Sequence, residues 1–265
     1  MVKMIVLDLD KTLLNDDGII TDYSMKTLKI CMENNIKIAF ATARSYDSTL
    51  RFIERVKPNI AIMNTGALTI YENKIFDQKP LPMKIANKII PELFQQKSAG
   101  KILIETENEK YRICKSDVEN DYKPWEYKKW NIEEPLVNDL LKIRFELFSE
   151  DIYLDLKEKY PECDIIHFTN EDWHMVQMKG ANKINAIRRI VEKDKISMNN
   201  VYAFGDDYND IDMIRECGIG IAMENGIDEV KNVAKYVCGN NNEDGVAKWI
   251  EKYILKNSKT ASNKR

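Results

Sequence analysis

The chain contains few cysteines, and their spacing suits neither disulfides nor a metal site. The 265 residues include five cysteines, at positions 31, 114, 163, 217 and 238, and no Cys-x-x-Cys pair. An odd number of scattered thiols is typical of a reduced protein and argues against a disulfide framework or a zinc site. We therefore expect a cytoplasmic protein whose thiols are mostly buried.

Long apolar stretches and an excess of positive charge are also missing. No uncharged apolar run approaches the roughly 18 residues that a membrane helix needs. Residues 1–8 run directly into a carboxylate, without the apolar stretch of a signal peptide. Forty Lys and Arg stand against 43 Asp and Glu, whereas nucleic-acid-binding domains are usually strongly basic. We expect a protein that binds neither membrane nor nucleic acid, and its oligomeric state stays open.

Short apolar runs alternate with helical patterns at both ends of the chain. Residues 4–7, 36–41 and 60–63 are apolar runs typical of strands buried on both faces. Helices are expected over 22–34, with Asp22 as N-cap, and from Ser45 onward. The alternation returns after residue 181, with helices near 182–194 and 209–217 and strands at 201–204, 219–223 and 236–238. This order predicts an α/β fold, a Rossmann-like parallel sheet with right-handed crossovers.

The middle of the chain has a different pattern. Strands are expected at 101–106, 110–114, 141–148, 164–169 and 173–178, with a helix over 150–159. The sequence therefore predicts a core of residues 1–80 and 179–265 and an inserted α+β module of residues 81–178. That module carries 14 Lys and Arg against 20 Asp and Glu, a net charge of −6.

Two acidic motifs follow predicted strands. Asp8 and Asp10 are two residues apart directly after the first strand, so their side chains project to the same side of an extended chain. The segment Gly205 to Asp210 follows the strand at 201–204 and adds the carboxylates of Asp206, Asp207 and Asp210. Like charges this close are costly without a cation, and hard oxygen ligands suit Mg²⁺.

Two weaker sequence signals of an anion-binding site lie at other element ends of the same predicted α/β fold. Thr42, Ala43 and Arg44 close the second strand and bring a hydroxyl and backbone N–H groups to a helix start, which is a favourable place for an anion. Lys183 begins the helix near 182–194. Each feature alone is usually structural, but their order along the chain is specific.

With these motifs in this order, the chain resembles the haloacid dehalogenase-like hydrolases, and among them the Cof-type phosphatases of subclass IIB, which have an inserted C2 cap. The family's Asp-x-Asp-x-Thr motif is similar to Asp8 to Thr12, its Thr/Ser motif to Thr42, its lysine to Lys183, and its Gly-Asp-x-x-Asn-Asp motif to Gly205 to Asp210. The module 81–178 resembles the cap that selects the substrate.

The resemblance implies a Mg²⁺-dependent phosphatase of small phosphorylated metabolites, such as sugar phosphates or nucleotides. It implies that Asp8 is the nucleophile and Asp10 the general acid and base. Metal binding would fall to Asp8, the Asp10 carbonyl and Asp206. The residues that would bind phosphate are Leu9, Thr42, Ala43, Lys183 and Asn209. The residues that would orient the catalytic and metal-binding groups without themselves binding the phosphate are Asp207, Asp210, Thr12 and Arg44.

Some positions depart from the family pattern. Lys11 and Ala43 stand where glycine is usual, and Thr65 interrupts an Asn-Gly-Ala stretch after the third strand, so the role of Asn64 stays open. Two other functions also stay open: phosphoryl transfer between hydroxyls, as in phosphomannomutases, and phosphate binding without catalysis. The charge of the inserted module favours a substrate with a neutral or polar leaving group.

Overall fold

The computed structural model describes residues 2–107, 109–113, 127–168 and 172–256. The chain forms two compact units. The core unit comprises Met1–Asp77 and Asn182–Arg265, and the inserted unit comprises Gln78–Ala181. The chain therefore leaves the core once and returns to it once.

The core unit is built on an eight-stranded sheet with the order β14-β13-β12-β1-β2-β3-β4-β5. Neighbouring strands from β14 to β3 pair in parallel. Their bounds are β1 Met4–Leu7, β2 Lys37–Ala41, β3 Ile60–Met63, β12 Val201–Gly205, β13 Ile219–Ala222 and β14 Tyr236–Val237. The predicted α/β fold with a parallel sheet is confirmed.

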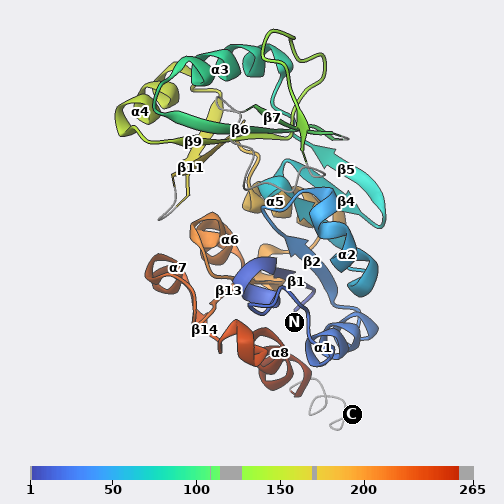
Figure 1. Ribbon diagram of the computed structural model, residues 1–265. Helices are drawn as coiled ribbons and strands as arrows, with labels where there is room; N and C mark the ends of the chain where they lie inside the picture. The colour runs from blue at the N-terminus through green and yellow to red at the C-terminus, as the bar shows by residue number, and fades with distance from the viewer. Residues whose placement is uncertain (1, 108, 114–126, 169–171, 257–265) are drawn as a thin grey trace. The chain divides into compact units, whose positions relative to one another are not determined.

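Helices cover both faces of this sheet, which explains why its strands are apolar throughout (Figure 1). On one face Phe40 and Phe204 pack in a core with Trp249. On the other face Val6 and Ala203 pack in a second core. The first core includes side chains of α1 (Asp22–Glu33), α2 (Tyr46–Val56) and α8 (Gly245–Ile250), and the second those of α5 (Lys183–Asp194), α6 (Ile211–Glu216) and α7 (Asp228–Val233).

Two local features of the core unit differ from the sequence-based expectation. Thr21, and not Asp22, is the N-cap of α1, because the Thr21 hydroxyl accepts a hydrogen bond from the Ser24 amide. A hairpin of β4 (Leu68–Tyr71) and β5 (Lys74–Gln78), which we did not predict, extends the sheet beyond β3. Its turn residues, Glu72 and Asn73, both have positive φ, as a tight two-residue hairpin turn requires.

The inserted unit is a six-stranded sheet with the order β10-β11-β9-β6-β7-β8. Its strands are β6 Ala99–Glu105, β7 Lys110–Ile113, β8 Lys128–Lys129, β9 Lys142–Leu147, β10 Cys163–His167 and β11 Trp173–Met178. Two helices, α3 (Met83–Gln95) and α4 (Glu150–Lys159), pack on the same face of it, where Phe145 and Val176 form the core with Leu93 and Leu156. We did not predict α3, although its apolar residues recur at helical spacing.

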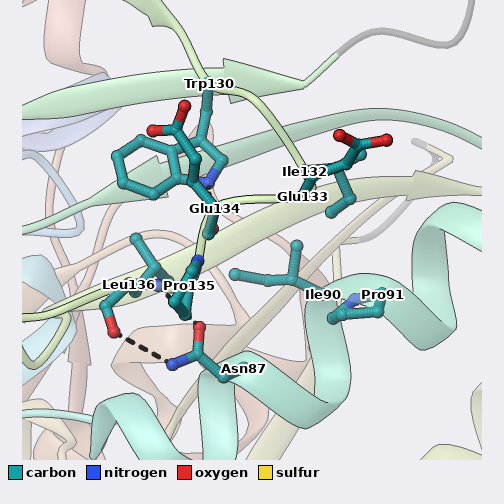
Figure 2. A pocket seen from close by; sticks show the side chains of 9 residues that line it. All are labelled: Asn87, Ile90, Pro91, Trp130, Ile132, Glu133, Glu134, Pro135 and Leu136. Atoms are coloured by element: carbon teal, nitrogen blue, oxygen red, sulfur yellow. Dashed lines mark hydrogen bonds between the residues drawn. The ribbon is translucent and has the colours of Figure 1, made fainter.

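A cavity of about 210 Å³ lies between α3 and the segment 130–136 of the inserted unit (Figure 2). The Asn87 amide group donates to the Leu136 carbonyl and accepts from the Leu136 amide, at 3.0 and 2.8 Å. The Trp130 indole N–H donates to the Glu134 carbonyl. The two Asn87 hydrogen bonds hold the segment against α3, and the Trp130 hydrogen bond lies within the segment itself.

The four cysteines within the described residues are free and buried, and the fifth, Cys114, lies outside them. Burial raises the pKa of the Cys31 and Cys217 thiols to about 12, which makes them unreactive. Among the helices that the structure describes, none has the length and apolar character to cross a membrane.

Candidate active site

Three strands of the core unit end at the same edge of the sheet. Parallel pairing aligns Leu7 of β1 with Phe40 of β2 and with Phe204 of β12. Asp8 follows the first of these strands and Thr42 the second, and both side chains are buried. In open α/β sheets, the carboxyl ends of the strands form the ligand-binding crevice.

Lys183 lies at the start of α5 with only 1% of its surface exposed. Its Nζ donates to Asp8 Oδ1 and to Asp210 Oδ1, both at 2.6 Å. The Asn182 side chain caps the helix by accepting from the Asn185 amide. Gly66 allows the close approach of this helix start, because its φ is +109° and a Cβ there would lie 2.3 Å from the Asn182 carbonyl oxygen. The lysine is thus held in place by backbone packing.

The segment after β12 turns around the Asp210 carboxylate. Asp210 Oδ2 accepts from the backbone amides of Asp206 and Asp207 at 3.0 and 3.2 Å. The Thr12 hydroxyl donates to Asp206 Oδ1 at 2.8 Å. Asp207 instead caps the Tyr208 amide and is only half-buried. The two neighbouring acids therefore have different surroundings, and Asp206 belongs to the buried cluster.

The carboxylates of Asp8, Asp206 and Asp210 each place an oxygen within 4.8 Å of the other two, and all three residues are buried. Burial raises the pKa of Asp8 well above its usual range, although Lys183 opposes the shift. Burial, together with the charge of Asp210, raises the pKa of Asp206 to about 7. Burial disfavours the Lys183 ammonium, but Asp210 and Asp8 outweigh this effect and raise its pKa.

This charge balance fits a divalent cation. Three carboxylates carry three negative charges, and within the described residues Lys183 is the cation that contacts the cluster. Burial is the main cause of the raised pKa values of Asp8 and Asp206, and the neighbouring carboxylates add to it. A second source of positive charge would offset both effects. Carboxylate oxygens are hard ligands of the kind that Mg²⁺ prefers, and one or two of these three would be enough to hold the ion.

Asp10 lies apart from the buried cluster. Its side chain is 54% exposed, and Arg44 binds both of its carboxylate oxygens, through Nε at 2.8 Å and Nη2 at 2.6 Å. Lys11 adopts a positive φ of 55° in the turn that follows β1, Leu9–Leu13, where a non-glycine residue is uncommon. Arg44 was predicted only as a supporting residue, and the sequence did not indicate that it binds Asp10.

Several buried polar atoms near these strand ends have no hydrogen-bond partner in the described part of the chain. They are both amide atoms of Asn64, the Thr65 hydroxyl and Asn209 Oδ1. A buried polar atom left without a partner costs about 1–3 kcal/mol. These atoms are therefore suited to meet polar groups of a ligand. We did not predict Thr65 as a site residue, although its place directly after β3 was a usable signal.

The structure thus brings together Asp8, Lys183, Asp206 and Asp210, supported by Thr12, and pairs Asp10 with Arg44 beside them. A buried carboxylate beside an ammonium and further carboxylates can attack an electrophile while its charge is balanced by cations. The fold and this cluster define an α/β enzyme suited to phosphoryl transfer.

Comparison with known proteins identifies the family. The sequence profile of the haloacid dehalogenase-like hydrolases matches residues 5–250. A 5-amino-6-(5-phospho-D-ribitylamino)uracil phosphatase of Bacillus subtilis is 27% identical and covers 96% of each chain. A putative phosphatase of Haemophilus influenzae is 30% identical over 95% of this chain and 98% of its own.

Solved structures show the same fold. The protein SMU.1108c of Streptococcus mutans superposes with a TM-score of 0.85 at 23% identity, covering 96% of this chain and 100% of its own. The subclass IIB sugar phosphatase BT4131 superposes with a TM-score of 0.82 at 20% identity, covering 95% and 99%. The chain belongs to the haloacid dehalogenase-like hydrolases, as the motifs predicted, and it is a phosphatase of that family.

Proposed function

We propose that the protein is a Mg²⁺-dependent phosphatase that hydrolyses a small phosphorylated metabolite through an aspartyl-phosphate. The observation that carries this proposal is the cluster of three buried carboxylates beside the buried ammonium of Lys183. This arrangement supplies a nucleophile, its orientation and a cation site at one sheet edge.

In the first step, a carboxylate oxygen of Asp8 attacks phosphorus while the bond from phosphorus to the leaving oxygen breaks. The hydrogen bond from Lys183 to Asp8 Oδ1 fixes the orientation of that carboxylate. Asp10 gives its proton to the departing oxygen. In the second step Asp10 takes a proton from water, the resulting hydroxide attacks phosphorus, and the bond to Asp8 breaks to release inorganic phosphate.

Arg44 constrains the proton transfer by Asp10. Arg44 donates to both oxygens of Asp10. When Asp10 carries a proton, one of these oxygens becomes an O–H donor and a weaker acceptor, so the hydrogen bond from Arg44 to that oxygen weakens. We propose that the entering substrate displaces part of this pair.

The Asp8 and Asp206 carboxylates and the Asp10 carbonyl would hold the magnesium ion. When bound, the ion supplies positive charge that offsets the repulsion between the nucleophile and the phosphate oxygens. Thr42, Lys183, Asn209 and the backbone amides of Leu9 and Ala43 would bind the phosphate, a set that the family resemblance implies. The amide nitrogen of Asn209 is the donor that would reach a phosphate oxygen, whereas its buried Oδ1, which has no partner within the described residues, can only accept from a donor group.

We propose that the inserted unit, residues 81–178 by its predicted bounds, is a cap that selects the leaving group. The substrate class we propose is a sugar phosphate or a nucleotide-like phosphate. Two similar proteins support this range, since one is named a sugar phosphatase and the other a phosphatase of a phosphorylated ribitylaminouracil. The scattered, buried thiols support a cytoplasmic protein.

The test is a screen of phosphorylated metabolites with Mg²⁺, scored by phosphate release, for the wild type and for Asp8→Asn. We expect release by the wild type, loss with EDTA, and at most a small residual rate in Asp8→Asn. Asp207→Asn is the matched control, because it makes the same change outside the buried cluster. Full turnover by Asp8→Asn would contradict the covalent mechanism. A requirement for a sugar bisphosphate would favour the phosphomannomutase-like alternative.

A further inference from the structure

One short segment of the core unit contacts the backbone of both acidic motifs. Residues 223–227 connect β13 to α7. The Ile227 amide donates to the Asp206 carbonyl at 2.9 Å. The side-chain amide of Asn225 donates to the Lys11 carbonyl at 2.7 Å. The segment therefore holds the chain after β12 and the turn after β1 at the same time.

The contact of this segment with Asp206 is close. Gly226 lies directly against it, and a Cβ at this position would be 3.0 Å from both the Cα and the carbonyl oxygen of Asp206. The Gly226 amide donates to the Met223 carbonyl at 3.0 Å, which closes a tight turn. The segment that presents Asn225 is thus fixed to the backbone of Asp206.

The contact with Lys11 stabilises a disfavoured backbone conformation. Lys11 has a φ of 55°, a value that residues other than glycine rarely adopt and that persists where surrounding contacts fix it. Because each peptide group is planar, the torsion angles of Lys11 set the direction of the Asp10 carbonyl relative to the Lys11 carbonyl. The hydrogen bond from Asn225 therefore acts on the orientation of the Asp10 carbonyl as well.

A second asparagine holds Asn225 in one orientation. The backbone amide of Asn241 donates to Asn225 Oδ1 at 2.9 Å. Since the Lys11 carbonyl can only accept and the Asn241 amide can only donate, the two ends of the Asn225 amide group cannot be exchanged. The buried Asn241 side chain donates in turn to the Leu14 carbonyl at 3.0 Å. The two asparagines thus bind the turn after β1 at two of its carbonyls.

We propose that Asn225 is a positioning residue for the metal site. Through the Lys11 carbonyl it fixes the Asp10 carbonyl relative to the Asp206 carboxylate, and both of these groups would hold the magnesium ion. The Thr12 hydroxyl, which donates to Asp206 Oδ1 at 2.8 Å, joins the same two segments through a side chain. Asn225 acts through the backbone and is not itself a ligand of the ion. This inference rests on the proposed function.

The experiment measures the binding of Mg²⁺ to the substrate-free protein by isothermal titration calorimetry. We expect Asn225→Ala to raise the Kd for Mg²⁺ by about 10-fold, as is typical when a residue that orients a metal ligand is removed. The Mg²⁺ concentration needed for half-maximal phosphate release should rise by the same factor. At saturating Mg²⁺, kcat and the KM for the ester should stay close to the wild-type values, because the bound ion then holds the carbonyl in place.

Two further variants separate positioning from stability. Asn225→Asp has the same shape and still accepts from the Asn241 amide, but it has no donor for the Lys11 carbonyl. Its new negative charge alone would favour a cation, so weaker Mg²⁺ binding in this variant would report the lost hydrogen bond. Asn241→Ala removes the hydrogen bond to the Leu14 carbonyl and keeps the backbone amide that holds Asn225. It should lower the free energy of unfolding in EDTA and leave the Kd for Mg²⁺ unchanged.

The outcomes distinguish this proposal from the proposed function. A wild-type Kd in Asn225→Ala, tighter Mg²⁺ binding in Asn225→Asp, or an equal rise in Kd in Asn241→Ala would overturn the positioning role. If Asn225→Ala did not fold, the comparison of Asn225→Asp with Asn241→Ala would decide by the same criteria. If the wild type bound no Mg²⁺ and released phosphate from no ester, the proposed function itself would fail.

Discussion

Replacing Lys183 by methionine removes the cation that, within the described residues, contacts two of the three clustered carboxylates, those of Asp8 and Asp210. The ammonium is 2.6 Å from both Asp8 Oδ1 and Asp210 Oδ1, and the side chain is 1% exposed. Breaking a buried ion pair by removing one partner typically costs about 3–5 kcal/mol, because it leaves a charge buried without compensation. Since a domain is stable by only about 5–15 kcal/mol, we expect Lys183→Met to fold with a much reduced free energy of unfolding.

The assay is urea unfolding with EDTA at pH 8 and pH 5. The control is Arg215→Met, which breaks the exposed pair between Arg215 and Asp212 and should cost no more than about 1 kcal/mol. At pH 5 the loss in Lys183→Met should shrink, because the raised pKa of Asp206, about 7, lets this carboxyl take up a proton in place of the missing ammonium. Added Mg²⁺ should restore part of the stability at pH 8.

Two results would refute this reasoning. The first is a loss in Lys183→Met no larger than that in Arg215→Met, since the buried ammonium would then not balance the cluster. The second is a loss that grows at pH 5, because protonation of the acids would then not relieve the uncompensated charge. Either result would also weaken the case for a cation site built on the same carboxylates.

Three further predictions concern individual acids. Asp10→Ala should lower kcat by about 10²–10⁴-fold with little change in KM, because only proton transfer is lost. Lys183→Met should instead also raise KM. Steady-state kinetics that show a similar rise in KM for both variants would contradict this prediction. Asp206→Asn should raise the Mg²⁺ concentration needed for half-maximal activity more than Asp207→Asn does. A Mg²⁺ titration of activity that gives the opposite order would assign metal binding to Asp207 in place of Asp206. Because the pKa of Asp206 rises from 3.8 to about 7 on folding, the folded state binds more protons between these values, so the metal-free protein should lose stability as pH rises through that window. Thermal denaturation with EDTA should show this slope, and a slope unchanged in Asp206→Asn would assign it to another group.

The sequence by itself determined the fold class and the position of the buried cluster. Apolar runs bounded by polar residues indicated the parallel strands, and the motifs after β1 and β12 placed Asp8 and Asp206 at strand ends. Parallel strands bring their carboxyl ends to one edge, so residues almost 200 positions apart were expected together. Local pattern and strand direction are enough for this inference.

Other features of the fold were missed or misplaced in the sequence-based prediction. The helix α3 and the hairpin of β4 and β5 were missed, although helical spacing and the two-residue turn at Glu72 and Asn73 were available as signals. The N-cap of α1 fell on Thr21 because the hydroxyl of that residue, and not the carboxylate of Asp22, reaches the Ser24 amide. Neighbouring polar residues compete for such a cap, and only the backbone angles decide between them.

Only the tertiary structure decided how charges pair across the chain. Arg44 binds Asp10, and Asp210 both receives the ammonium of Lys183 and holds two backbone amides, which the order of residues does not reveal. The same holds for the inserted unit, whose acidic composition coexists with a sheet face where Arg144 meets aromatic rings instead of an acid. Net charge sums over a whole surface, whereas binding depends on which groups remain unpaired at one place, and that is set by strand register and packing.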